Sequence, residues 1–249
     1  HRFQIFDADG NFIETWGEQG KGDGQFQMML QNQAIFTDIE FAADGSFAVL
    51  DPGNGRVQVF GSDREFLFSL GGFGSGDGQF VFPIDLALAP DGAFWVTDDK
   101  RQDAQQFDAE GDFQTSFTLP DGYYLSWDHV VDEEGHHFLT VAKEGINTGF
   151  EVLELDADGT FVRTIGAPSE DIPVFASELT ELAFDSAGRM LVGSGYPNDT
   201  SVYVFERDGT LLGRIEAGGI VQGLAIDANG DFYVLNSSDG TLSKFRLAP

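Results

Sequence analysis

Four carboxylates recur at one position of a repeated pattern in this chain of 249 residues. Each lies seven residues before a glycine that ends a turn, and the four are Asp38, Asp85, Asp128 and Glu181. Carboxylates that converge repel one another, and a hard cation with oxygen ligands, such as Ca²⁺, relieves that repulsion. The series therefore predicts a metal site, with Glu40 and His129 beside it. The alternative is that these carboxylates bind backbone amides or face solvent.

Other catalytic chemistry finds little support in the residue types. The chain has no cysteine, which excludes a thiol nucleophile and Cys-ligated metals. Of the four histidines only His129 is well placed, so we expect no zinc site built from several imidazoles. No Gly-x-Ser-x-Gly sequence marks a nucleophilic serine.

The charge balance restricts the partners. Lys and Arg total 13 against 42 Asp and Glu, a net charge of −29. A phosphate backbone requires clustered Lys and Arg, so we expect no nucleic-acid partner. No apolar run reaches the ~18 residues of a membrane helix, so we expect no membrane insertion. A surface rich in carboxylates stays soluble at high salt, which favours a saline, extracellular or periplasmic setting.

The positions of these residues follow from an internal repeat. Turn glycines recur at 42 to 53 residues, and the five are Gly45, Gly92, Gly135, Gly188 and Gly230. An alternating apolar run flanks each glycine, and a second hairpin follows in the first four repeats. Four antiparallel strands at this period are typical of a β-propeller blade. Bulky residues recur in the third strand and predict the core between blades: Phe6, Phe60, Phe107, Leu155, Phe205 and Phe245.

The predicted fold class is therefore all-β, a β-propeller that occupies residues 1–249 as a single domain. The expected blade repeats are 1–26 (partial), 34–80, 81–119, 125–166, 178–217 and 220–249 (partial). The first repeat has only a hairpin and the last has only three strands. The whole chain therefore has three strands fewer than six four-stranded blades require. We therefore expect a six-bladed propeller whose N-terminal, ring-closing segment lies outside this sequence. The alternative is five blades with a redundant strand.

Local motifs resemble those of the NHL-repeat family. They are His1-Arg-Phe-Gln-Ile-Phe6, followed by an Asp-Gly turn, and Asp51-Pro-Gly-Asn54-Gly-Arg56-Val-Gln-Val-Phe60. Two matching glycine loops, 17–26 and 71–80, are similar to the family's linkers between blades. A phosphate-binding loop is not expected, because neither loop opens a helix or contains the Gly-Lys-Ser/Thr sequence. The resemblance is strong in 1–118 and 201–247 and weak in 125–200. It implies a β-propeller and no particular activity.

Aromatic residues in the expected linkers complete the candidate surface. Tyr123, Tyr124, Trp127 and Tyr196 are expected near the end of the propeller that carries the acidic series. Exposed aromatic groups beside carboxylates are typical of binding surfaces. With no recognisable catalytic set, we predict a monomeric, non-enzymatic binding platform for a protein, peptide or glycan. The alternative is a metal-dependent hydrolase or lactonase, similar to gluconolactonase-like propellers, in which the acidic series holds Ca²⁺ and polarises a carbonyl. The series departs from that pattern because it has no Asn.

Overall fold

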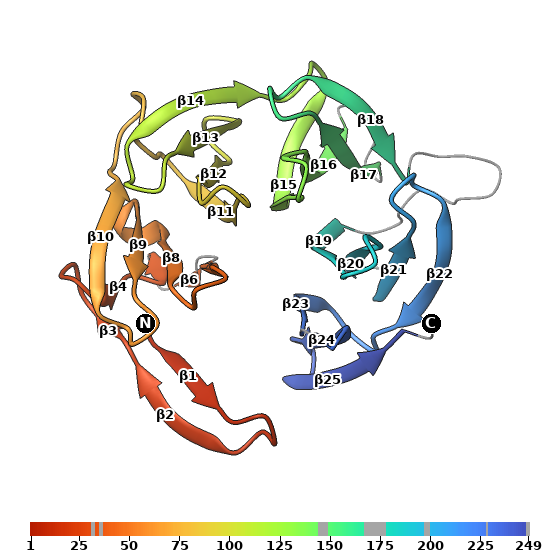
Figure 1. The fold of residues 1–249 in the computed structure, drawn as a ribbon, viewed down its shortest axis with the longest axis horizontal. Helices are drawn as coiled ribbons and strands as arrows, with labels where there is room; N and C mark the ends of the chain where they lie inside the picture. The colour runs from red at the N-terminus through yellow and green to blue at the C-terminus, as the bar shows by residue number, and fades with distance from the viewer. Residues whose placement is uncertain are drawn as a thin grey trace. The chain divides into compact units, whose positions relative to one another are not determined.

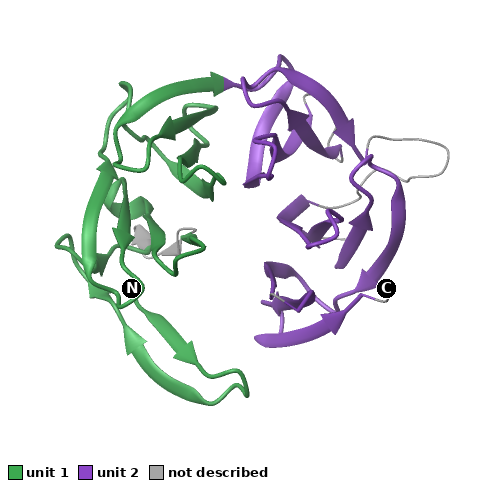
Figure 2. Cartoon of the chain, in the orientation of Figure 1, with its two compact units in different colours: residues 1–117 green, residues 118–249 purple. Residues whose placement is uncertain are grey.

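The computed structural model describes residues 1–30, 33–34, 37–143, 149–166, 178–196, 200–227 and 229–247. Contacts divide the chain into two compact units, His1–Phe117 and Thr118–Pro249 (Figure 2). The regular structure described in both units is β-strand, apart from a single 3₁₀ turn, Pro52–Asn54. None of the described segments forms a helix with the length and apolarity needed to cross a bilayer.

Unit 1 contains two four-stranded antiparallel sheets, the first and second blades, whose strands are adjacent in chain order (Figure 1). The first blade consists of β7 (Ile39–Phe41), β8 (Phe47–Asp51), β9 (Arg56–Phe60) and β10 (Phe66–Gly71). The second consists of β11 (Pro83–Leu88), β12 (Phe94–Asp98), β13 (Asp103–Phe107) and β14 (Phe113–Thr118). Before them, the chain forms a hairpin and two short pairs: β1 (Phe3–Phe6) with β2 (Phe12–Trp16), β3 (Glu18–Gln19) with β4 (Gln25–Phe26), and β5 (Met29–Leu30) with β6 (Gln33–Ala34).

Unit 2 contains the third, fourth and fifth blades, which follow the same strand order. The third consists of β15 (Tyr123–Val131), β16 (His137–Lys143), β17 (Phe150–Leu155) and β18 (Phe161–Ile165). The fourth consists of β19 (Glu178–Phe184), β20 (Met190–Tyr196), β21 (Ser201–Phe205) and β22 (Leu211–Glu216). The fifth has three strands, β23 (Val221–Ile226), β24 (Asp231–Asn236) and β25 (Thr241–Arg246).

The predicted four-stranded antiparallel blades are confirmed, and the predicted number of six is not. Within the described residues there are five blades, four complete and one of three strands. The partial repeat at residues 1–26 contributes a hairpin whose sheet has two strands only. Because no further strand pairs with this hairpin among the described residues, it does not form a sixth blade.

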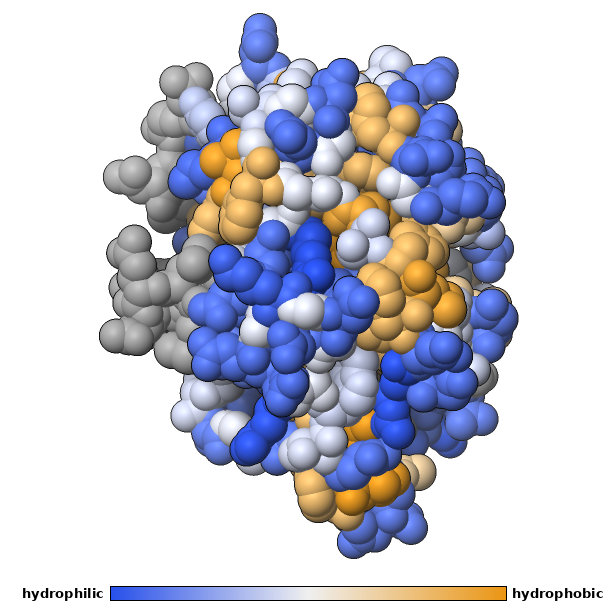
Figure 3. Space-filling view, turned by 90° about the vertical axis from the view of Figure 1, so that its left-hand side faces the viewer, coloured by the Kyte–Doolittle hydropathy of each residue, from blue (hydrophilic) through white to orange (hydrophobic). Residues whose placement is uncertain are grey.

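The core lies between consecutive blades of each unit, as the bulky third-strand residues predicted. Phe60, Phe107, Leu155 and Phe205 are each at most 1% exposed. One apolar cluster in unit 1 joins side chains of the first and second blades, and another in unit 2 joins the third and fourth. Phe6, the third-strand residue of the β1–β2 hairpin, is 52% exposed, so its predicted place in the core is wrong. Figure 3 shows apolar patches among hydrophilic ones on this side of unit 1, including one at the lower end, which carries the hairpin.

Aspartates build the hairpin turns. In the turn after β1, Asp7 Oδ1 accepts the backbone N–H of Asp9 at 3.0 Å and of Asn11 at 2.7 Å. Asp156 makes the same two bonds after β17, to Asp158 and Thr160. Such a turn needs a positive φ at its glycine, and Gly10 has a φ of 82°. Asp7-Ala-Asp-Gly10 and Asp156-Ala-Asp-Gly159 are therefore hairpin turns.

A buried carboxylate, Asp98 at the end of β12, holds the segment that enters the second blade. Its Oδ2 accepts the backbone N–H groups of Val81 at 2.6 Å and Phe82 at 2.9 Å, and its Oδ1 accepts those of Lys100 and Arg101. The residue is fully buried. Because a buried N–H without an acceptor is costly, this one side chain fixes both the incoming linker and the loop after β12.

Asp51 has the equivalent place in the first blade and explains the NHL-like motif. It accepts hydrogen bonds from Gln27 N, Asn54 Nδ2 and Arg56 Nε at 2.8, 2.8 and 3.0 Å. Asn54 and Arg56 in turn donate to backbone carbonyls of the glycine loop 17–26, those of Gly20, Gly22 and Gln25. In the matching loop 71–80, Gly71 has a φ of 90°, and a Cβ there would lie 2.2 Å from the ring of Phe80. Both glycine loops are therefore linkers, as predicted.

Replacing Asp98 with Asn should destabilise unit 1 by about 2–3 kcal/mol, because an amide nitrogen cannot accept the two N–H groups that one carboxylate oxygen now accepts. Urea denaturation of the variant measures the loss. Asp99→Asn is the matched control: Asp99 forms an ion pair with Lys100 whose lysine is 64% exposed, and such pairs contribute at most about 1 kcal/mol. Equal denaturation midpoints for the two variants would contradict the role assigned to Asp98.

Candidate functional site

The acidic series lies at the first strands of the first four blades. Asp85, Asp128 and Glu181 are within β11, β15 and β19, and Asp38 directly precedes β7. In β11, β19 and β23 the pairing register shifts just before the residue that lies seven positions ahead of the turn glycine. Asp85 is therefore opposite Thr97, and Glu181 is opposite Gly193. In the fifth blade the residue at this position is Gly223, which is opposite Leu235. Bulges re-aim side chains at the ends of strands. The series is thus a structural position shared by the blades, as its spacing predicted.

Two members of the series bind backbone amides of the following blade. Asp38 accepts the N–H of Ile39 at 2.7 Å and also that of Leu86, which directly follows Asp85. Asp128 accepts the N–H of His129 at 2.9 Å and that of Leu182, which directly follows Glu181. The same link therefore joins the first two blades within unit 1 and the third and fourth within unit 2. For these two residues the structure agrees with the alternative of amide binding.

Burial affects the protonation of Asp38. Desolvation raises the pKa of Asp38 to about 6, although the amides of Ile39 and Leu86 favour the ionised form. Asp38 is partly buried, and Asp85 is buried, with 6% of its surface exposed. The Asp38 carboxyl group is therefore a hydrogen-bonding partner whose charge changes with pH near neutrality.

The metal site predicted from the whole series stays a prediction. In the part of the chain that the structure describes, no three His, Asp or Glu side chains are grouped so that they could hold a metal ion. The series is divided between the units, with Asp38 and Asp85 in unit 1 and Asp128 and Glu181 in unit 2. Glu40 lies in β7, opposite Ala48, and is partly exposed.

His129 lies inside the third blade. Its Nε2 is 2.9 Å from Nδ1 of His137 on β16, and each residue is 1% exposed. Burial, together with the charge of His137, lowers the pKa of His129 well below its usual value, and burial lowers that of His137 to about 4. Both rings are neutral at pH 7 and share one hydrogen bond. A ligand on the surface cannot contact His129.

The candidate aromatic residues lie in strands, and their predicted placement in linkers is wrong. Tyr123, Tyr124 and Trp127 belong to β15, and Tyr196 ends β20. β15 begins at Tyr123 because Tyr123 pairs with Lys143, and β20 continues to Tyr196 because it pairs with Glu178. The Tyr196 side chain is outside the described part of the structure.

A wide bulge in β15 directs Trp127 towards the fourth blade. Leu125 pairs with Val141 and His129 with Leu139, so three residues of β15 share one opposite residue, Thr140. Thr140 Oγ1 accepts the N–H groups of Trp127 and Asp128 at 3.0 and 2.9 Å. The indole Nε1 of Trp127 then donates to Glu178 Oε2 at 3.2 Å.

Tyr123 takes part in a second aromatic and acidic group at the same end of the third blade. Its hydroxyl donates to Glu151 Oε2 at 3.3 Å. The Lys143 ammonium lies 5.2 Å from the centre of the Tyr123 ring and 3.8 Å from Glu151 Oε1. Tyr124, the next residue, lies on the opposite face of the strand and is 45% exposed. We call this set, Tyr123, Tyr124, Trp127, Glu151 and Glu178, the aromatic–acidic end.

The aromatic–acidic end can bind cations and flat apolar groups. The sequence reasoning did not find Glu151, Glu178 or Lys143. Their contacts join residues 28 and 51 positions apart in the chain. Only the pairing register brings them to the aromatic side chains, so no local spacing could have identified them.

Comparison with known proteins supports the fold. No protein-family model matches the chain, and no curated protein matches it, so membership of the NHL-repeat family is not confirmed. A catalytically inactive virginiamycin B lyase from Staphylococcus aureus with quinupristin is 11% identical, with a TM-score of 0.62 over 98% of this chain and 77% of that one. A gluconolactonase from Xanthomonas campestris is 18% identical, with a TM-score of 0.60 over 86% of this chain and 77% of that one. A β-propeller domain from Myceliophteria thermophila is 12% identical, with a TM-score of 0.60 over 87% and 66%. The chain therefore has a β-propeller fold, and identities this low show the fold alone.

Replacing Asp38 with Asn should change how stability depends on pH. Because the folded pKa of about 6 lies above the ordinary value of 3.8, the carboxyl group favours folding most below pH 3.8, and this contribution is lost as the pH rises to about 6. At pH 8 the Asp38→Asn variant should therefore gain ~1–2 kcal/mol relative to the native chain, and at pH 4 it should gain little. Urea denaturation at the two pH values measures the difference.

The exposed turn residue Asp44 is the control, since hydrogen bonds to Ser46 lower its pKa. Asp44→Asn should give the opposite trend, with a loss of stability above pH 4. A gain for Asp38→Asn that is the same at pH 4 and pH 8 would refute the assigned ionisation.

Proposed function

We propose that this chain is an NHL-like, six-bladed propeller that acts as a non-enzymatic binding platform, and that its ligand is a cationic peptide segment of a protein. The observation that supports the proposal most is the use of Asp38 and Asp128 as backbone acceptors between blades. The alternative, a metal-dependent hydrolase, would need these carboxylates as metal ligands. A platform needs them only to keep neighbouring blades aligned.

The proposed binding site is the aromatic–acidic end of unit 2. Tyrosine and tryptophan contribute most to binding energy at protein interfaces, and Tyr124 is 45% exposed. A net charge of −29 attracts cationic ligands over long distances and repels anionic ones. The position of Lys143, between the Tyr123 ring and the Glu151 carboxylate, indicates how a ligand lysine or arginine would bind there.

The acidic surface also supports proposals about the protein's location and its oligomeric state. Strong net charge of one sign opposes self-association, which supports a monomer. The same charge suits a saline environment, and we propose an extracellular or periplasmic location on that ground. A glycan is the other ligand class compatible with exposed tyrosine and tryptophan beside carboxylates.

A labelled peptide of alternating lysine and glycine tests the platform, with a glutamate–glycine peptide as the charge control. We expect saturable binding of the lysine peptide in fluorescence anisotropy. Tyr124→Ala and Trp127→Ala should each weaken it about tenfold, and Glu178→Gln should weaken it several-fold.

Glu206→Gln is the matched control, because it removes the same charge from an exposed turn of the fourth blade. It should leave the affinity nearly unchanged. Equal losses for Glu178→Gln and Glu206→Gln would show that only the net charge attracts the peptide. Binding of a neutral oligosaccharide that is lost in Tyr124→Ala would replace the peptide with a glycan.

The second candidate is the metal-dependent hydrolase or lactonase. It is supported by the recurrence of the acidic series and by the similarity in fold to a gluconolactonase. Under this proposal Asp38, Asp85, Asp128 and Glu181 hold Ca²⁺, which would polarise the carbonyl of an ester or lactone.

Isothermal titration with Ca²⁺, and with Mg²⁺ for comparison, tests the second candidate. If it is correct, Ca²⁺ binds the native chain, Asp85→Asn weakens the binding about tenfold or more, and the bound ion supports lactone hydrolysis. Absence of Ca²⁺ binding would refute this candidate, and Ca²⁺ binding without hydrolysis would leave the ion a structural role.

A further inference from the structure

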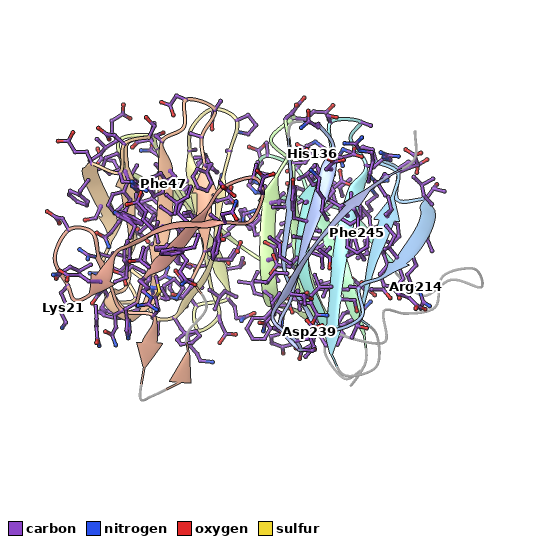
Figure 4. The ribbon with its side chains drawn as sticks, turned by 90° about the horizontal axis from the view of Figure 1, so that it is seen from below. Lys21, Phe47, His136, Arg214, Asp239 and Phe245 are labelled. Carbon is purple, nitrogen blue, oxygen red and sulfur yellow. The ribbon has the colours of Figure 1, made fainter. Side chains whose placement is uncertain are left out.

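Three adjacent strands of the third blade bring Lys143 to an aromatic ring and a carboxylate. Tyr123 on β15 pairs directly with Lys143, the last residue of β16. Glu151 on β17 pairs with Val141, two residues before Lys143. Residues two apart on a strand share a face, so these side chains lie on one face of the sheet. Figure 4 labels His136, which directly precedes β16, and the contacts of Lys143 lie at the other end of that strand.

The Lys143 ammonium group occupies a place where a ring and a carboxylate both attract a cation. It lies 5.2 Å from the centre of the Tyr123 ring and 3.8 Å from Glu151 Oε1. The charge of Glu151 raises the pKa of Lys143, so the ammonium group is charged at pH 7. At 3.8 Å the contact is longer than a hydrogen bond, so Glu151 attracts Lys143 through charge alone. Such a contact is readily exchanged for one with another cation.

The carboxylate is buried and fixed, whereas the lysine is neither. The Glu151 side chain is 5% exposed, and that of Lys143 is 42% exposed. The Tyr123 hydroxyl donates to the other carboxylate oxygen, Glu151 Oε2, at 3.3 Å and holds the carboxylate beside the ring. A nearly buried carboxylate needs a cation, because burial removes the water that would otherwise stabilise its charge. Within the described residues, Lys143 is the one cation that pairs with Glu151.

A second lysine of unit 2 has similar contacts in a different environment. Lys244 on β25 lies 4.9 Å from the centre of the Tyr233 ring and 2.8 Å from Asp231 Oδ2. Asp231 also pairs with Arg246, so its charge stays balanced if Lys244 moves away. At Glu151, by contrast, the departure of the lysine leaves a place for another cation.

We propose that Tyr123 and Glu151 form a subsite for an alkylammonium group, which Lys143 occupies in the free protein and a lysine side chain of the ligand occupies in the complex. Two ammonium groups beside one carboxylate repel each other, so the ligand lysine replaces Lys143. Lys143 is thus a tethered competitor that lowers the affinity for cationic ligands. Its competition with a ligand rests on the proposed function, whereas the affinity of the subsite for an alkylammonium group does not.

The lysine–glycine peptide measures the competition. Lys143→Met removes the competitor and keeps a long, unbranched side chain, so the affinity for the peptide should rise about fivefold. Lys143→Arg keeps a cation in place and should stay within about twofold of the native chain. Lys244→Met is the matched control, because it removes the same charge from the same kind of contact, and it should also stay within about twofold. Equal gains for the two Met variants, or no gain for Lys143→Met, would overturn the competition.

Chemical rescue tests the subsite without the peptide. Lys143→Ala leaves Glu151 without its cation, so the melting temperature should fall by about 2–4 °C. n-Butylammonium, which has the carbon chain and the ammonium group of a lysine side chain, should raise it again in a saturable manner. NaCl at the same concentration should not. Lys244→Ala should show no such rise, because Arg246 still pairs with Asp231. The subsite is overturned if n-butylammonium gives no saturable rise, or if NaCl or the Lys244→Ala variant gives an equal one.

The two experiments separate this inference from the proposed function. If the peptide binds neither the native chain nor Lys143→Met while n-butylammonium rescues Lys143→Ala, the subsite stands and the proposed peptide ligand is wrong. If the peptide binds the native chain and neither Lys143 variant behaves as expected, the platform stands and Lys143 forms a structural ion pair only.

Discussion

The acceptance of backbone N–H groups by aspartate side chains is the interaction on which the arrangement of each unit depends. A blade satisfies its own backbone through the ladder between strands, but the ladder stops at every turn, bulge and linker. Asp7 and Asp156 supply acceptors within turns, Asp98 supplies them to a linker, and Asp38 supplies one to the neighbouring blade. Without these oxygens, donors would be left unpaired at each place where the chain changes direction.

This constraint gives part of the acid excess a structural explanation. Carboxylates suit the purpose better than amides because both oxygens accept and neither donates. Asp98 uses both oxygens for four backbone donors, and Asp128 uses both for two. A high count of Asp is therefore weak support for a metal site in a protein made of tight turns. The informative carboxylates are those that meet an aromatic side chain, as Glu178 meets Trp127.

The sequence predicts the fold well because its signals are local. Alternation of apolar residues and the Asp-Gly turns depend on neighbours a few positions apart, and the structure has strands and turns where they occur. The limits of β15 and β20 were missed because Tyr123 and Tyr196 follow segments rich in turn residues, and their strand character comes from pairing with Lys143 and Glu178. The spacing identified the acidic series as one structural position. It could not decide whether a carboxylate there binds an ion or an amide, since the amide belongs to a different blade.

The aromatic–acidic end illustrates a consequence of the same backbone requirement. At the bulge of β15 the ladder of backbone hydrogen bonds between strands is interrupted. There the side chain of Thr140, through Oγ1, accepts the N–H groups of Trp127 and Asp128 in place of a backbone carbonyl. That substitution allows Trp127 to leave the plane of its own sheet and reach Glu178 without loss of backbone hydrogen bonding. Side-chain acceptors can therefore replace a few ladder bonds at a bulge, and in this way the chain brings an aromatic side chain of one blade to a carboxylate of the next.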